Sequence, residues 1–175
     1  MMKKDYVVLV NDKNEELGTM EKLAAHSDKT PLHRGFSLFL FNQQGELLLQ
    51  QRAHEKKTWG GVWSNSVCGH PKVKESAIAA ARRRLAFELG ITDAEIEMAL
   101  PNYRYKVEKD GIVENEICPV MVGYTKQIPQ PNSDEVAAIK WIPWKKWLVE
   151  IEKHPDGYSP WAVEETQLLI QEKKI

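Results

Sequence analysis

The 175-residue sequence has no long apolar run, only two cysteines and no excess of basic charge. No apolar segment approaches the ~20 residues that a helix needs to cross a bilayer, so we expect no membrane partner. The net charge is −1, with 24 Lys and Arg against 25 Asp and Glu, and this balance argues against a nucleic-acid partner. The initial segment MMKKDYVVLV is too short and too soon polar to be a secretory signal. The scarcity of cysteine, Cys68 and Cys118 alone, favours a reducing cytosol and a cytoplasmic protein.

The length and the hydrophobic patterns indicate one domain over residues 1–175, with strands and helices interspersed. Predicted strands cover 6–10, 35–41, 46–52, 103–108, 112–125 and 137–142. Predicted helices cover 19–26, 75–89, 144–153 and 161–173. A mixed sheet with helices on both faces is an α+β fold. Residues 53–66 are expected to form a long aromatic-rich loop that can cover a pocket and exclude water.

The segment Gly69–Ile91, GHPKVKESAIAAARRRLAFELGI, carries an incomplete motif for binding phosphate and metal ions. It resembles the Nudix box, and the matching polar and glycine positions are Gly69, Glu75, Arg83, Glu88 and Gly90. Arg84 and Phe87 stand where that box has glutamates. Five alanines, an apolar stripe at helical spacing and the final glycine predict a helix over 75–89.

The two departures from the box have a chemical consequence. Hydrolases that carry the complete box use its carboxylates to hold magnesium ions around a diphosphate and to activate water. Replacing two carboxylates with a cation and a phenyl ring should weaken that metal loading, whereas the Arg84 guanidinium can hold a diphosphate oxygen directly. The motif therefore predicts diphosphate binding without hydrolysis.

Outside the helix, histidines and glutamates gather in a pattern typical of a metal site. In extended backbone, residues two apart point the same way, so Glu114 and Glu116 would share one face of a strand and repel each other unless a cation intervenes. His70 lies two residues after Cys68, and His26 and His33 flank a predicted turn. Three imidazoles and two carboxylates suit manganese, zinc or iron better than calcium.

The same residues belong to longer segments that occur in order between residues 22 and 161. They are HSDKTPLHRGFS, LLQQRA, KKTWGGVWSNSVCGHP, YRYK, GIVENEICPV and YSPW. With the incomplete box, they make the chain similar to the type I isopentenyl diphosphate isomerases. This resemblance implies a Nudix fold and the interconversion of isopentenyl and dimethylallyl diphosphate, in isoprenoid biosynthesis, by protonation and deprotonation through a tertiary carbocation.

The resemblance also implies roles for individual residues. Cys68 and Glu116 would exchange protons on opposite faces of the substrate, and the order in which they act stays open. Tyr105 would hydrogen-bond Glu116, with Tyr103 as a competitor for this role. Trp161 would place its ring face against the carbocation.

Two ions and a group of cations complete the implied site. The metal ligands would be His26, His33, His70, Glu114 and Glu116 for Mn²⁺ or Zn²⁺, and Glu88 for a Mg²⁺ that also binds the diphosphate, with the Cys68 carbonyl nearby. The substrate diphosphate would be held by Lys22, Arg52, Lys56 and Arg84.

Two other function classes are weighed against the isomerase. A Nudix diphosphate hydrolase would need the carboxylates missing at positions 84 and 87 and has no use for Cys68 paired with Glu116. A binding module without turnover would not need an acid and a base on opposed segments. We expect a small isoprenyl diphosphate as the partner and a monomer or weak homodimer as the assembly, and the sequence does not choose between these two states.

Overall fold

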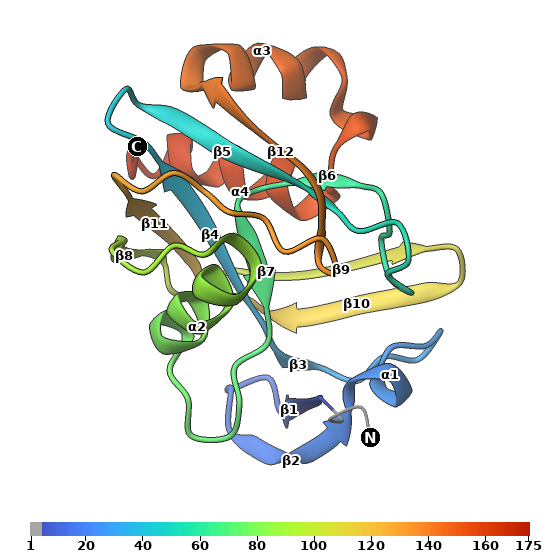
Figure 1. Ribbon diagram of the computed structural model, residues 1–175. Coiled ribbons are helices and arrows are strands. Elements are labelled where there is room, and N and C mark those ends of the chain that lie inside the picture. The colour runs from blue at the N-terminus through green and yellow to red at the C-terminus, as the bar shows by residue number, and fades with distance from the viewer. Residues whose placement is uncertain (1–4) are drawn as a thin grey trace.

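The computed structural model describes residues 5–175, so the first four residues of the predicted domain 1–175 lie outside the described part. Two sheets form the framework, and helices cover the larger one on both faces (Figure 1). The five-stranded sheet has the order β2 (Glu16–Glu21), β1 (Tyr6–Val10), β3 (His33–Arg34), β10 (Ile112–Ile117), β9 (Arg104–Lys109). The seven-stranded sheet has the order β12 (Val136–Pro143), β5 (Glu46–Arg52), β4 (Phe36–Phe41), β11 (Val120–Tyr124), β8 (Glu95–Leu100), with β6 (Trp63–Ser64) on β5 and β7 (Val67–Gly69) on β4.

Strand β4 is the centre of the core because all six of its residues are buried. Side chains alternate along a strand, so Phe39 and Phe41 pack on one face and Leu38 and Leu40 on the other. The first face meets helices α3 (Trp144–Lys153) and α4 (Pro160–Gln171), and the second meets α2 (Ala77–Leu89). The predicted α+β fold, a mixed sheet between helices, is confirmed.

Helix α2 ends where its sequence predicts but begins later. Ser76 caps it by accepting a hydrogen bond from the Ala79 backbone N–H at 3.2 Å, and the left-handed Gly90 ends it at φ 67°. The helix begins two residues later than predicted, which leaves Glu75 in the preceding turn.

Several predicted boundaries are wrong. The single strand predicted at 112–125 is two strands in different sheets, because the chain passes from one sheet to the other at Cys118 and Pro119. The helix predicted at 19–26 is the short α1 (Lys22–Ala25), since residues 16–21 pair with β1 instead. Strands β2, β3, β6, β7 and β8 were not predicted, and the 3₁₀ turn η1 (Pro155–Gly157) precedes α4.

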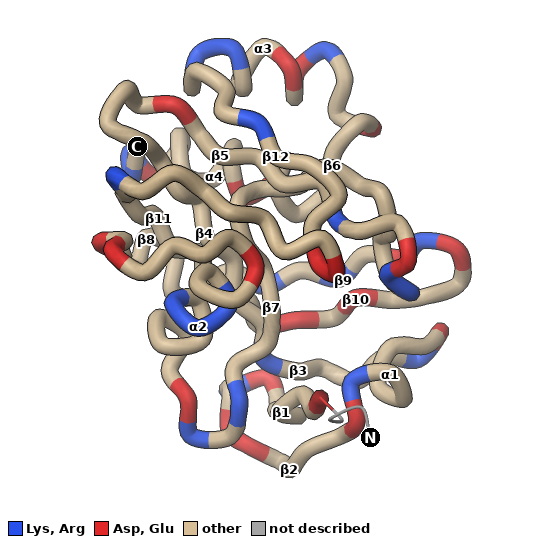
Figure 2. Tube along the Cα trace, viewed as in Figure 1, with Lys and Arg blue, Asp and Glu red and all other residues tan. Residues whose placement is uncertain are grey.

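Charges of both signs are spread over the molecule (Figure 2), in keeping with the balanced composition. In the part of the chain that the structure describes, no helix is both long enough and apolar enough to cross a membrane.

Candidate active site and metal centre

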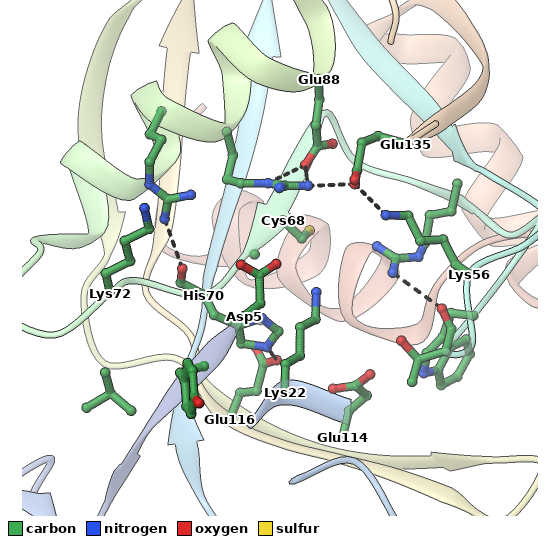
Figure 3. Close-up of a pocket in the computed structure, with 18 of the residues that line it drawn as sticks. Asp5, Lys22, Lys56, Cys68, His70, Lys72, Glu88, Glu114, Glu116 and Glu135 are labelled. Carbon is green, nitrogen blue, oxygen red and sulfur yellow. Dashed lines mark hydrogen bonds and ion pairs between the residues drawn. The ribbon is translucent and has the colours of Figure 1, made fainter. Parts of the chain in front are cut away.

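A pocket of about 560 Å³ is lined by residues of both sheets and of α1, α2 and α4 (Figure 3). The pocket is lined by eleven of the predicted site residues: Lys22, Arg52, Lys56, Cys68, His70, Arg84, Glu88, Tyr105, Glu114, Glu116 and Trp161. The other two, His26 and His33, do not line it but contact Glu114 and Glu116. Residues that are up to 139 positions apart in the sequence therefore meet around one cavity.

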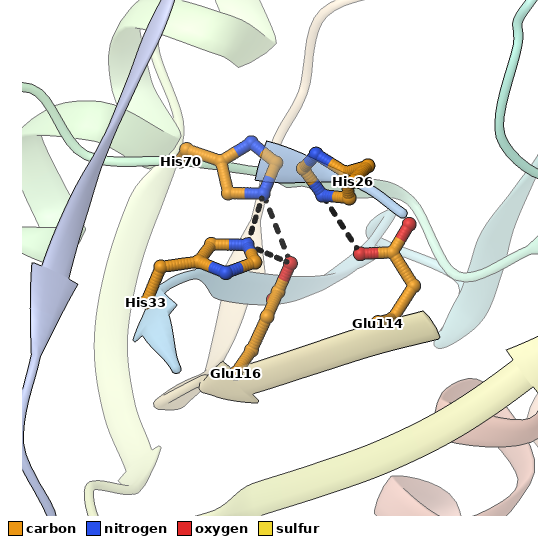
Figure 4. Close-up of side chains that lie close together, drawn as sticks. All are labelled: His26, His33, His70, Glu114 and Glu116. Atoms are coloured by element: carbon orange, nitrogen blue, oxygen red, sulfur yellow. Dashed lines mark hydrogen bonds and ion pairs between the residues drawn. The ribbon is translucent and has the colours of Figure 1, made fainter. Parts of the chain in front are cut away.

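The predicted metal ligands form one cluster (Figure 4). One ligand atom from each of His26, His33, His70, Glu114 and Glu116 lies within 4.8 Å of all the others. Glu114 Oε2 is 3.0 Å from His26 Nε2, and Glu116 Oε1 is 2.9 Å from His70 Nε2. His33 Nε2 lies 3.2 Å from His70 Nε2 and 3.4 Å from Glu116 Oε1.

Sheet pairing builds this cluster. Strand β3 runs parallel to β10 and sets His33 beside Glu116. Glu114 lies two residues before Glu116 and projects from the same face, as predicted. His26 follows α1, and His70 follows β7.

Hydrogen bonds to backbone carbonyls orient the rings of His26 and His33. His26 Nδ1 lies 2.7 Å from the Lys22 carbonyl oxygen, and His33 Nδ1 lies 2.9 Å from the Pro31 carbonyl oxygen. Each Nδ1 donates to its carbonyl, so the Nε2 atom is the one that faces the cluster. Three imidazole nitrogens and two carboxylates that converge in this way are a donor set that fits a divalent ion.

Gly35 is required by the position of Glu116. A Cβ at residue 35 would stand 1.8 Å from Glu116 Oε2, well inside van der Waals contact. Only glycine leaves room for the carboxylate there. The sequence offered no signal for this role.

Cys68 lies on β7 with its sulfur in the pocket wall. Its Sγ donates to Asn65 Oδ1 at 3.2 Å and lies 3.6 Å from Ser37 Oγ. Burial raises the pKa of Cys68 to about 12. A raised pKa favours the neutral thiol over the thiolate.

Aromatic rings form the wall beside the two predicted proton-exchange groups. Tyr105 lies directly opposite Glu116 in the β9–β10 pair, and its ring is 5.7 Å from that of Trp161. Trp59, in the predicted covering loop, meets Trp161 edge to face at 5.0 Å. The competitor Tyr103 does not line the pocket, and its hydroxyl donates to Glu164 Oε2 at 3.0 Å. The geometry therefore favours Tyr105 over Tyr103, and its hydrogen bond to Glu116 stays a prediction.

The four predicted diphosphate-binding cations, Lys22, Arg52, Lys56 and Arg84, line the same pocket. Burial lowers the pKa of Lys22, and the charges of Arg52 and Arg84 lower it further. Four positive charges in one partly buried place repel one another unless anions balance them. The arrangement suits a diphosphate.

Two carboxylates hold part of this group in place. Arg84 Nε donates to Glu88 Oε1 at 2.8 Å, and Arg84 Nη2 donates to Glu135 Oε2 at 2.7 Å. Glu135 also pairs with Lys56. Gln50 Nε2 donates to Glu88 Oε2 at 2.7 Å, and burial raises the pKa of Glu88. Sequence reasoning missed Glu135, which belongs to no motif, and Gln50, which lies in the LLQQRA segment but gave no signal of a role in the site.

The remaining box residues have structural positions. Arg83 makes two hydrogen bonds of 2.8 Å to Glu75 and donates to the His70 carbonyl at 3.2 Å. Phe87 is 54% exposed, so the substituted box position faces away from the pocket. Cys118 is 2% exposed and packs in the core as a small apolar side chain.

Comparison with known proteins matches these observations. The NUDIX domain model matches residues 31–162. The crystal structure of DR0079 from Deinococcus radiodurans has a TM-score of 0.73 at 18% identity and covers 93% of this chain and 98% of that one. The MutT protein from Methanosarcina mazei has a TM-score of 0.67 at 20% identity, covering 83% and 97%. The chain therefore has a Nudix fold and is a member of the NUDIX family.

Relatives of higher sequence identity show which family of NUDIX proteins the chain belongs to. "Isopentenyl-diphosphate Delta-isomerase" of Saccharopolyspora erythraea is 44% identical over 168 residues, which are 95% of this chain and 87% of the relative. The protein of that name from Klebsiella pneumoniae is 44% identical over 93% of this chain and 89% of its own length. The chain belongs to the isopentenyl-diphosphate Delta-isomerase family, and the resemblance seen in its sequence is confirmed.

Proposed function

We propose that this enzyme interconverts isopentenyl and dimethylallyl diphosphate within the pocket described above. The observation that carries the proposal is that Cys68 and Glu116 line one pocket together with a group of cations and an aromatic wall that includes Tyr105 and Trp161. The cations suit a diphosphate, the aromatic wall suits a short hydrocarbon, and the two proton-exchange groups lie where the hydrocarbon would be.

In the direction from isopentenyl diphosphate, the C3–C4 double bond takes a proton at C4 and leaves positive charge at C3. Loss of a proton from C2 then forms the C2–C3 double bond. One proton enters and one leaves, so the reaction needs one acid and one base but no oxidant. Cys68 and Glu116 supply this pair, and because the reaction is reversible either direction uses both.

The carbocation must meet neither water nor a nucleophile. The Trp161 ring is buried and lines the pocket, and its Nε1 donates to Ser64 Oγ at 3.1 Å. The negative quadrupole of its ring face can stabilise positive charge. The Trp59 loop covers this ring and keeps water from the reacting carbons.

The ions belong to this proposal as well. A Mn²⁺ or Zn²⁺ held by His26, His33, His70, Glu114 and Glu116 would keep the Glu116 carboxylate oriented. A Mg²⁺ at Glu88 would neutralise part of the diphosphate charge. Arg52, Lys56, Lys22 and Arg84 hold the remaining phosphate oxygens. We also propose that the chain works in the cytoplasm, as a single domain and as a monomer or weak homodimer.

Incubation with isopentenyl diphosphate and Mg²⁺ in deuterium oxide tests the proposal. The expected result is dimethylallyl diphosphate that carries deuterium, followed by NMR. Release of inorganic phosphate without isomerisation would indicate a hydrolase instead. Binding of the substrate with neither product would indicate a module without turnover.

A further inference from the structure

A buried polar network joins helix α4 to Cys68. Glu165 on α4 is fully buried, and its Oε2 lies 2.6 Å from Ser37 Oγ. Ser37 Oγ in turn lies 3.6 Å from Cys68 Sγ. Glu165 Oε1 is buried and has no hydrogen-bond partner among the described residues. No role assigned so far uses this carboxyl group.

Asn65 fixes the direction of the hydrogens in the network. Its Nδ2 donates to the Leu38 carbonyl at 3.0 Å and to Ser37 Oγ at 2.8 Å. A carbonyl can only accept, so the other amide atom, Oδ1, is the one that faces Cys68. Ser37 Oγ therefore accepts from Asn65, and its own hydrogen is free to point to Glu165 or to Cys68.

The protonation state of Glu165 decides whether the Ser37 hydrogen points to Glu165 or to Cys68. Burial raises the pKa of Glu165 well above its ordinary range, and no cation pairs with it in the described part of the chain. A neutral acid carries one hydrogen, and placing it on Oε1 would leave a buried donor unpaired. On Oε2 the hydrogen bonds Ser37 Oγ, and the Ser37 hydrogen then faces the Cys68 sulfur.

We propose that Glu165 is a positioning residue that, through Ser37, directs a hydroxyl hydrogen to Cys68 Sγ and so holds the sulfur in one orientation while it exchanges a proton with the substrate. Glu165 itself does not touch the substrate. This inference rests on the proposed function, because it requires Cys68 to be one of the two proton-exchange groups.

Steady-state kinetics on three variants test the inference. Glu165→Leu removes the donor and keeps the volume apolar, and we expect kcat to fall about tenfold with KM nearly unchanged, as for loss of one hydrogen bond. Glu165→Gln should retain most of kcat, because its amide N–H can donate to Ser37 as the neutral acid does. Glu164→Gln, on the same helix but bonded to Tyr103 instead, is the matched control and should match the parent. A parent-like kcat for Glu165→Leu, or an equal loss in Glu165→Gln, would overturn the inference.

Two further measurements keep the test independent of folding. Ser37→Ala should show the same fall in kcat, and a parent-like value overturns the inference even if Glu165→Leu does not fold. Infrared difference spectra between the parent and Glu165→Gln should contain a neutral carboxylic acid band, and its absence also overturns it. If the parent itself fails to isomerise isopentenyl diphosphate, the proposed function is wrong. If the parent is active, Cys68→Ala is inactive and Glu165→Leu is unaffected, only the role of Glu165 is wrong.

Discussion

Gly35 and Glu116 approach so closely that a methyl group on the glycine would overlap the carboxylate, with 1.8 Å between the added Cβ and Oε2. Gly35 separates β3 from β4, so the same residue also leads the chain from the sheet that carries the metal ligands into the core. The backbone cannot move aside easily, because the Gly35 N–H donates to the Ile117 carbonyl at 2.9 Å.

We therefore expect Gly35→Ala to displace Glu116, to reduce bound metal severalfold and to abolish most turnover. Elemental analysis of protein purified without chelator, together with the deuterium assay, measures both effects. Gly157→Ala is the control, because a Cβ there meets nothing within 4 Å. Full metal content in Gly35→Ala would show that Glu116 is not a ligand or that it can rearrange.

Cys68→Ala should abolish turnover while leaving diphosphate binding measurable, because the thiol exchanges a proton but the cations hold the substrate. The second cysteine provides the control: Cys118→Ala alters the core at a position outside the pocket and should keep most of the activity. Substantial activity in Cys68→Ala would mean that Cys68 is not one of the two proton-exchange groups.

The sequence revealed those parts of the site that lie in short continuous motifs. The helix and its C-terminal end followed from periodicity and Gly90, whereas its N-cap, Ser76, was not predicted. The cluster of histidines and glutamates followed from its segments. Contacts between distant residues stayed hidden. The parallel pairing that places His33 beside Glu116 joins residues 83 positions apart, and the contact between Ser37 and Glu165 joins residues 128 positions apart. No local pattern encodes either contact, because each depends on how the sheets and α4 pack.

The ion pair between Glu75 and Arg83 gives the protein a pH-dependent contribution to stability. Hydrogen bonds from Arg83 lower the pKa of Glu75 below its ordinary value of 4.5. A lowered pKa in the folded state means that the contribution is present above pH 4.5 and is lost as the pH falls through the lower, folded value.

We expect Glu75→Gln to be less stable than the parent at neutral pH by less than about 1 kcal/mol, since partly exposed ion pairs contribute little. The difference should vanish in acid. Urea unfolding from pH 7 down to about 3 measures it. The control is Glu172→Gln, in an exposed position at the end of α4. A gap between Glu75→Gln and the parent that does not change with pH would contradict this account.

A substitution at Arg84 distinguishes an isomerase from a hydrolase as the function of this pocket. Arg84→Glu would restore a carboxylate of the Nudix box, but it would also set a third acid beside Glu88 and Glu135, which both bond Arg84. A substrate diphosphate would then lose a cation and meet added negative charge. We expect its affinity to fall at least about tenfold, because a hydrogen bond to a charged group contributes roughly 1.5–3 kcal/mol.

Titration calorimetry with isopentenyl diphosphate and Mg²⁺, in a Cys68→Ala background that cannot turn the substrate over, measures this affinity. Arg82→Glu is the matched control on the same helix: Arg82 is exposed, lies outside the pocket and donates to the Ala94 carbonyl. It carries the same change in charge, so it also reports any effect of net charge alone. Parent-like binding by Arg84→Glu, or equal losses in both variants, would mean that Arg84 does not hold the diphosphate directly. Phosphate release by Arg84→Glu in the active background would mean that the missing carboxylate is what separates this pocket from a hydrolase.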